Sequence, residues 1–130
     1  NPNSIAQVAA KAAILGPHDE VENMKSVFES RRDYMVDRIN KIKGVSCLKP
    51  DGAFYVMMNI KNLLGKKYFG IKIDSCDEFA NILLEKGNVA VVPGSGFGAN
   101  GYLRWSYATS LENIKLGLDR LEMFLKDGAN

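Results

Sequence analysis

Residues 91–108 read VVPGSGFGANGYLRWSYA, and this stretch is the most informative part of the sequence. An apolar run enters a glycine-dense loop, and a second run over 102–108 leaves it with Arg104 among aromatic and apolar neighbours. Because side chains alternate along a strand, we expect Arg104 on the face opposite Leu103 and Trp105. A lone guanidinium there calls for an anion, and a planar carboxylate suits it best by accepting two parallel hydrogen bonds. The alternative is an arginine on a solvated sheet face, paired with a surface carboxylate.

The loop from Gly94 to Gly98 invites comparison with nucleotide-binding loops, but its context argues against one. A dinucleotide-binding loop opens a helix whose N-terminus holds the phosphates, whereas this loop leads into a strand. Two interpretations stay open. The loop is a flexible connection between two strands, or its small residues let the backbone approach a ligand.

Elsewhere in the chain, four segments have helix-start signatures and one-sided apolar stripes. The signatures pair Ser4 with Gln7, Asp19 with Glu22, Ser75 with Glu78 and Thr109 with Glu112. The predicted helices cover 4–15, 19–43, 75–87 and the stretch from 109 to about 125. The second would be about 35 Å long, as wide as a domain of this size. We therefore expect one of its ends to reach past the local core and touch another body.

Strands are predicted over 45–48, 53–60, 89–92 and 102–108, with a loop over 62–73. Residues 53–60 and 89–92 are apolar on both faces, which is typical of strands buried on both sides. The order of elements predicts an α/β (α+β-like) two-layer sandwich, in which helices pack on a small mixed or antiparallel sheet.

The composition excludes several classes. The 130 residues form one domain by length, 46% of them are apolar and 25% charged, and the net charge is +2. There is no basic stripe interleaved with aromatics, no apolar run near the ~20 residues of a membrane span and no secretory signal. We expect neither a nucleic acid nor a membrane as partner. Cys47 and Cys76 are interpreted as reduced thiols of a cytoplasmic protein, and His18 has no companions for a metal site.

Five segments together resemble the small domain of class I aminotransferases of the aspartate aminotransferase type (fold type I). They are NPNSIAQ at 1–7, RRD at 31–33, PDGAFY at 50–55, VVPGSGFG at 91–98 and LRWSYA at 103–108. They occur in the family's order and approximate spacing over essentially the whole chain. The resemblance implies residues 1–18 as a helix connecting to a missing large domain, and 19–130 as the C-terminal small domain. In the chain alone, Ile5, Ala9 or Ile14 should then lie exposed or become buried against a neighbouring chain.

The resemblance also implies a function. The parent would be a homodimer that uses pyridoxal 5'-phosphate to move an amino group from an amino acid, with a leaning toward aspartate, to a 2-oxo acid. Arg104 would grip the substrate α-carboxylate, Phe97 would form a pocket wall, and Asn1 would lie near the active site at the domain boundary. The family's Schiff-base lysine and most of its phosphate cradle lie upstream of this chain. We therefore expect no catalytic, cofactor-binding or metal-binding residue here, and no transaminase activity from the chain alone.

Other classes remain open from the sequence. The chain could be an amino-acid-binding regulatory module that senses a ligand through the same arginine. It could also belong to a pyridoxal-dependent relative that does not transaminate, such as a β-lyase or an aminotransferase-like regulator. The start at Asn1 rather than Met favours a piece of a longer protein over a free-standing module.

Overall fold

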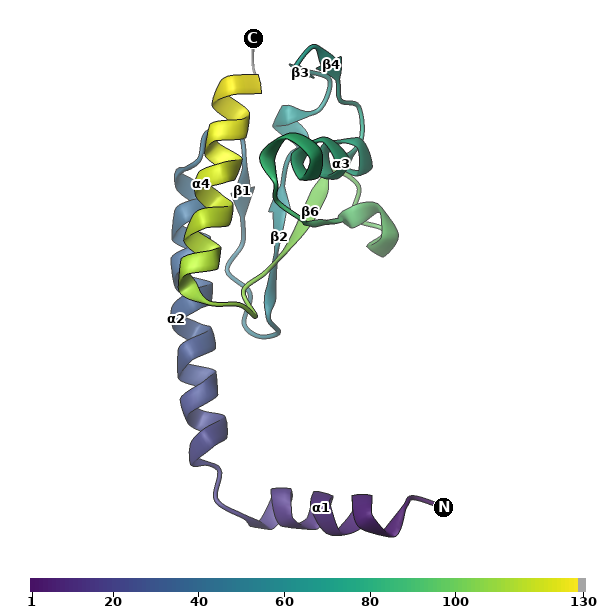
Figure 1. Cartoon of the computed structure of the whole chain (residues 1–130), viewed down its shortest axis with the longest axis vertical. Coiled ribbons are helices and arrows are strands. Elements are labelled where there is room, and N and C mark those ends of the chain that lie inside the picture. The colour runs from purple at the N-terminus through teal and green to yellow at the C-terminus, as the bar shows by residue number, and fades with distance from the viewer. Residues whose placement is uncertain (129–130) are drawn as a thin grey trace.

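The computed structural model of the chain describes residues 1–128 and forms two layers, a sheet and a layer of helices (Figure 1). The helices are α1 (Ser4–Leu15), α2 (Asp19–Lys41), α3 (Cys76–Gly87) and α4 (Leu111–Gly128). The strands are β1 (Ser46–Cys47), β2 (Tyr55–Asn59), β3 (Lys67–Tyr68), β4 (Ile71–Lys72), β5 (Val92–Pro93) and β6 (Tyr102–Ser106). Two short 3-10 turns, η1 (Lys61–Leu63) and η2 (Gly94–Phe97), complete the order.

The main sheet has the strand order β1-β2-β6-β5, and all its neighbouring pairs are antiparallel. Its centre is the pair β2–β6, where Val56 lies opposite Trp105 and Met58 opposite Leu103. These four side chains are buried and point to one face, which we call the inner face. The predicted two-layer sandwich is thereby confirmed, with a sheet that is antiparallel throughout.

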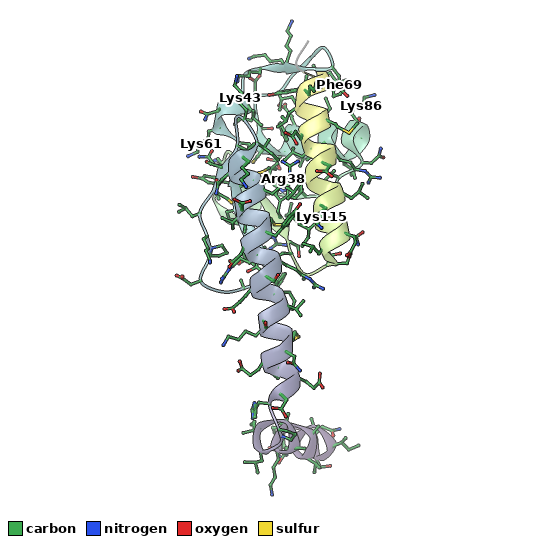
Figure 2. All side chains as sticks on the ribbon, turned by 90° about the vertical axis from the view of Figure 1, so that its left-hand side faces the viewer. Arg38, Lys43, Lys61, Phe69, Lys86 and Lys115 are labelled. Atoms are coloured by element: carbon green, nitrogen blue, oxygen red, sulfur yellow. The ribbon has the colours of Figure 1, made fainter. Side chains whose placement is uncertain are left out.

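Among residues 1–128, the helices that pack on the sheet lie on its inner face. Helix α2 packs against β1 and β2, α3 packs against β5 and β6, and α4 packs against both of these helices. Figure 2 shows α2 and α4 side by side, with Arg38 of α2 at their contact. Its guanidinium pairs with Asp119 at 3.0 Å and with Glu122, both on α4. The inner face of the sheet thus forms part of the core, and the outer face is not covered by these helices.

The N-terminal part of the chain leaves this body. In Figure 1, α2 extends well below the sheet, and α1 turns away from its end. No residue of α1 is buried, and Ile5 is 78% exposed. In α2 only Met35 and Ile39 are buried, whereas Val21 and Met24 are exposed. The expectation that the long helix reaches past the core is confirmed, as is the exposure of Ile5, Ala9 and Ile14.

Three of the four predicted helix-start signatures were displaced by one residue. At α2 the N-cap residue is His18, which makes no side-chain cap hydrogen bond, and Asp19 already lies in the helix. Asn3, rather than Ser4, caps α1, because its side-chain oxygen accepts from the backbone N–H of Ile5 at 2.8 Å. At α4 the hydroxyl of Ser110, rather than Thr109, accepts from the backbone of Asn113 at 3.2 Å. At α1 and α4 either neighbour is a good cap by residue type, so only the backbone geometry chooses between them.

The predicted strands were partly wrong. Strand β2 is buried on its inner face alone, since Tyr55, Met57 and Asn59 stay half-exposed on the outer one. Strand β5 starts only at Val92, which is 39% exposed, while Val89 is the buried residue of the predicted 89–92 run. An apolar run buried against helices on one side looks the same in sequence as one buried on both.

The stretch 62–73 is more ordered than predicted. It contains the end of η1 and the two-stranded pair β3–β4, with Tyr68 opposite Ile71. Phe69 and Gly70 turn this hairpin with positive φ angles of 50° and 79°.

No helix between residues 1 and 128 is long and apolar enough to cross a membrane. Cys47 and Cys76 are both free thiols.

Candidate functional site

Arg104 lies on the outer face of the sheet, as its alternation with buried Leu103 and Trp105 predicts. Met57 of β2 lies opposite it on one side, and Val92 of β5 on the other. The arginine is half-buried, so its stem rests on the sheet while its head reaches the surface. Antiparallel pairing on both sides fixes the backbone under the guanidinium.

Two aromatic rings flank this guanidinium. Its Cζ lies 4.7 Å from the ring centroid of Phe97 and 5.2 Å from that of Tyr55. Tyr55 comes from β2, and Phe97 comes from η2, which follows β5 on the other side of β6. Ring faces attract a cation and limit where it can swing. Within residues 1–128 no carboxylate forms a salt bridge with Arg104. The solvated alternative, an arginine paired with a surface carboxylate, is therefore not what the described residues form.

The glycine-rich loop forms the compact turn η2 beside Arg104. The backbone N–H of Gly98 donates to the carbonyl of Ser95 at 3.0 Å, and that of Ala99 donates to Gly94 at 2.9 Å. Gly94 is buried, and a Cβ there would press on the carbonyl oxygen of Ala99 and come within 2.8 Å of that of Tyr102. Glycine is needed at this position because the chain packs on itself, and the turn presents Phe97, 56% exposed, to solvent.

A second cluster holds the turn that leads into β2. The phenol of Tyr107 donates to the backbone carbonyl of Ala53 at 3.0 Å and lies 3.3 Å from that of Gly52. Arg32 donates to the carbonyl of Pro50 at 3.4 Å and to the carboxylate of Asp33 at 2.8 Å. Three segments that are distant in sequence, RRD, PDGAFY and LRWSYA, therefore meet in one place.

A hollow of about 320 Å³ lies between α2 and this turn. Its lining includes Phe28, Arg32 and Tyr107. Burial raises the pKa of the Tyr107 phenol above its ordinary value, and Arg32 opposes that shift. The hydrogen bond from Arg32 lowers the pKa of the Asp33 carboxyl. These groups fix the backbone that precedes Tyr55, and so the ring beside Arg104.

The remaining predicted site residues are less connected. Asn1 is exposed beyond the free end of α1, and no hydrogen bond or salt bridge within residues 1–128 joins it to Arg104. Its role stays a prediction. No group of three His, Cys, Asp or Glu side chains in the part of the chain that the structure describes could hold a metal ion. Nor is any lysine between residues 1 and 128 buried.

Sequence reasoning missed two contributors to the site. Tyr55 was noted in the PDGAFY segment but not as a neighbour of Arg104, and that contact follows from the β2–β6 register. Asp77 was not noted at all, yet it accepts a hydrogen bond from the Ser95 hydroxyl at 2.8 Å. Of these two, only the contact between Tyr55 and Arg104 could have been predicted, because both strands were predicted and side chains alternate between the two faces along each of them.

Comparison with known proteins agrees with this geometry. The sequence model described as "Aminotransferase class I and II" matches residues 2–121. The aspartate aminotransferase of Bacillus sp. (strain YM-2) is 44% identical over 126 residues, which is 97% of this chain and 31% of that protein. The aspartate aminotransferase of Geobacillus stearothermophilus is also 44% identical, with the same coverage. The chain thus spans about a third of the length of the curated relatives it matches.

Solved structures give the same result. The crystal structure of the aspartate aminotransferase from Rhizobium meliloti aligns with a TM-score of 0.91 and 39% identity, over 98% of this chain and 32% of that one. The alanine aminotransferase from Pyrococcus furiosus aligns with a TM-score of 0.84 and 35% identity, over 96% of this chain and 30% of that one. By its sequence, and with its fold in agreement, the chain belongs to the class I and II aminotransferase family.

Proposed function

We propose that residues 19–130 are the small C-terminal domain of a pyridoxal-phosphate-dependent aminotransferase, and that residues 1–18 connect it to a larger domain. The observation that carries this proposal is Arg104, flanked by two rings and joined to no carboxylate of residues 1–128. We further propose that the parent transfers an amino group from an amino acid, with aspartate favoured by the names of the relatives, to a 2-oxo acid. The parent would act as a homodimer.

The cofactor implied by the family does not fit the residues in hand. A lysine that forms a Schiff base works from a desolvated pocket, and every lysine between residues 1 and 128 is at the surface. We therefore propose that pyridoxal phosphate is held elsewhere in the parent. The chain alone should not turn over L-aspartate and 2-oxoglutarate.

The role proposed for Arg104 is to bind and orient. Its planar fork donates two parallel hydrogen bonds to the substrate α-carboxylate, which fixes both the position and the plane of that group. Phe97 and Tyr55 limit the swing of the guanidinium before substrate arrives, so less freedom is lost on binding. Fixing the carboxylate fixes the α-carbon next to it, and orientation of a reacting atom is a large contribution to rate.

The test is Arg104→Lys in the full-length enzyme, with specificity constants measured for L-aspartate and for β-alanine, its α-decarboxylated analogue. Lysine keeps the charge and loses the fork, so the variant should lose about 2–5 kcal/mol, ~30-fold or more, with L-aspartate. β-Alanine lacks the α-carboxylate and should be affected far less. Equal losses for the two amines, or no loss for either, would refute the role of Arg104.

A further inference from the structure

The turn η2 carries Phe97 against Arg104, and within residues 1–128 one side-chain hydrogen bond joins it to a helix. Its backbone hydrogen bonds run within the turn and to Ala99, and the turn directly follows β5, whose Pro93 pairs with Leu103 of β6. Gly94 is wedged at its start against Ala99 and Tyr102. The far part of the turn, which bears Phe97, is exposed at Gly96, Phe97 and Gly98.

This hydrogen bond, which we call the anchor, runs to helix α3. The Ser95 hydroxyl donates to the Asp77 carboxylate at 2.8 Å, across 18 residues of sequence. Within residues 1–128 it is the only hydrogen bond between η2 and a helix. The acceptor is charged, and such hydrogen bonds are stronger than those between neutral groups.

Asp77 is itself held rigidly. It lies in the first turn of α3, where the partial positive charge of the helix end favours a carboxylate. The helix start is closed by a capping box, in which Ser75 accepts from the Glu78 backbone at 3.1 Å and Glu78 accepts from the Ser75 backbone at 3.2 Å. Its neighbours Cys76 and Phe79 are buried in the core. A displacement of the Asp77 backbone would therefore require α3 to move on the sheet.

We propose that Asp77 and Ser95 are positioning residues for the substrate carboxylate. They hold η2 so that Phe97, two residues after Ser95, stays 4.7 Å from the Arg104 guanidinium. Without the anchor the turn shifts, the ring leaves the guanidinium, and Arg104 samples rotamers that do not face the carboxylate. This inference rests on the proposed function, since it assigns how Arg104 is kept ready for that ligand.

The experiment uses the full-length enzyme with L-aspartate or β-alanine as donor and 2-oxoglutarate as acceptor. Ser95→Ala and Asp77→Ala should each raise KM for L-aspartate about three- to tenfold, the effect of losing one solvent-exposed hydrogen bond. The turnover number should change less than twofold, on the order of experimental scatter, and the preference for L-aspartate over β-alanine should fall with the rise in KM. The double variant should be no worse than either single one, because both remove the same contact.

Two further variants separate positioning from damage to the fold. Ser95→Thr keeps the hydroxyl and should keep the wild-type KM. Asp74→Ala removes a carboxylate just before α3 that pairs with Lys72 and touches neither η2 nor Arg104, so it should also be silent. A loss of activity with unchanged KM, equal for both donors, would indicate unfolding and overturn the proposal.

The two proposals fail differently. If Arg104→Lys abolishes the preference for L-aspartate while Ser95→Ala and Asp77→Ala leave KM unchanged, the anchor is wrong and the carboxylate site stands. If Arg104→Lys has no effect on that preference, the proposed function itself fails, whatever the anchor variants do.

Discussion

The two faces of the β2–β6 pair differ sharply although they share one backbone. On the inner face Val56, Met58, Leu103 and Trp105 are buried under helices. On the outer face Arg104 lies half-exposed between Tyr55 and Phe97. The same ladder of hydrogen bonds therefore supports a core on one side and the proposed carboxylate-binding arginine on the other. Substitutions one residue apart on β6 should separate stability from function.

The largest expected effect is on the inner face. Leu103→Ala removes a side chain with no exposed surface, and it should lower the free energy of unfolding by about 2–5 kcal/mol. Arg104→Ala removes a half-exposed side chain that contacts the half-exposed ring of Tyr55 and the exposed ring of Phe97, and it should cost less than about 1 kcal/mol. Urea unfolding of both variants measures the difference. Similar costs would mean that the outer face contributes to folding as much as the core does.

Two glycines of η2, Gly94 and Gly96, extend this comparison to the turn that follows β5. Gly94→Ala places a Cβ against two backbone carbonyls, which cannot move aside as a flexible side chain can, and should cost about 1–3 kcal/mol. Gly96 has open space where its Cβ would be, so Gly96→Ala should lie within about 0.5 kcal/mol of wild type. Thermal unfolding of the two variants side by side is the measurement. If Gly94→Ala unfolds at the wild-type temperature, the carbonyl groups of Ala99 and Tyr102 do not crowd this position.

The smallest expected effect is at the open edge of the sheet. Cys47 of β1 lies opposite Met58, and burial raises the pKa of its thiol from 9.0 to about 11. The folded state therefore favours the protonated thiol. The stability that this gives is fully present below pH 9 and is lost as the pH rises toward about 11.

Alkylation by iodoacetamide over a pH series, followed by mass spectrometry of the Cys47 peptide, checks this prediction. Its midpoint should lie near pH 11 in the folded chain and near pH 9.0 in urea. The urea sample is the control for reagent reactivity. A midpoint near pH 9.0 in the folded chain would mean that water reaches the Cys47 thiol and that burial does not raise its pKa.

Patterns of residues a few positions apart predicted much of this structure. The alternation around Arg104 placed it opposite Leu103 and Trp105, and the apolar stripe of α3 gave its buried side. The capping box at Ser75 was also predicted as it stands. These features depend on neighbours along the chain, which a sequence displays directly.

Features that depend on distant residues could not be predicted in this way. Nothing in the run 53–60 says that helices cover only one of its faces, so its outer face was wrongly expected to be buried. The hydrogen bond between Ser95 and Asp77 joins two common residue types through tertiary packing alone. The β3–β4 pair was missed because a lysine- and glycine-containing stretch has weak strand propensity.

Helix α2 also sets how far the N-terminal end of the chain lies from the core. Its 23 residues run without a break, so it is a stiff rod about 35 Å long whose N-terminal part carries no buried side chain. The three-residue link 16–18 joins it to α1. A rotation of about ten degrees at this link would carry the far end of the rod through about 6 Å, roughly twice the length of a hydrogen bond. Under the proposed function, a slight change of angle beside α1 would therefore change whether the Arg104 guanidinium reaches a substrate carboxylate.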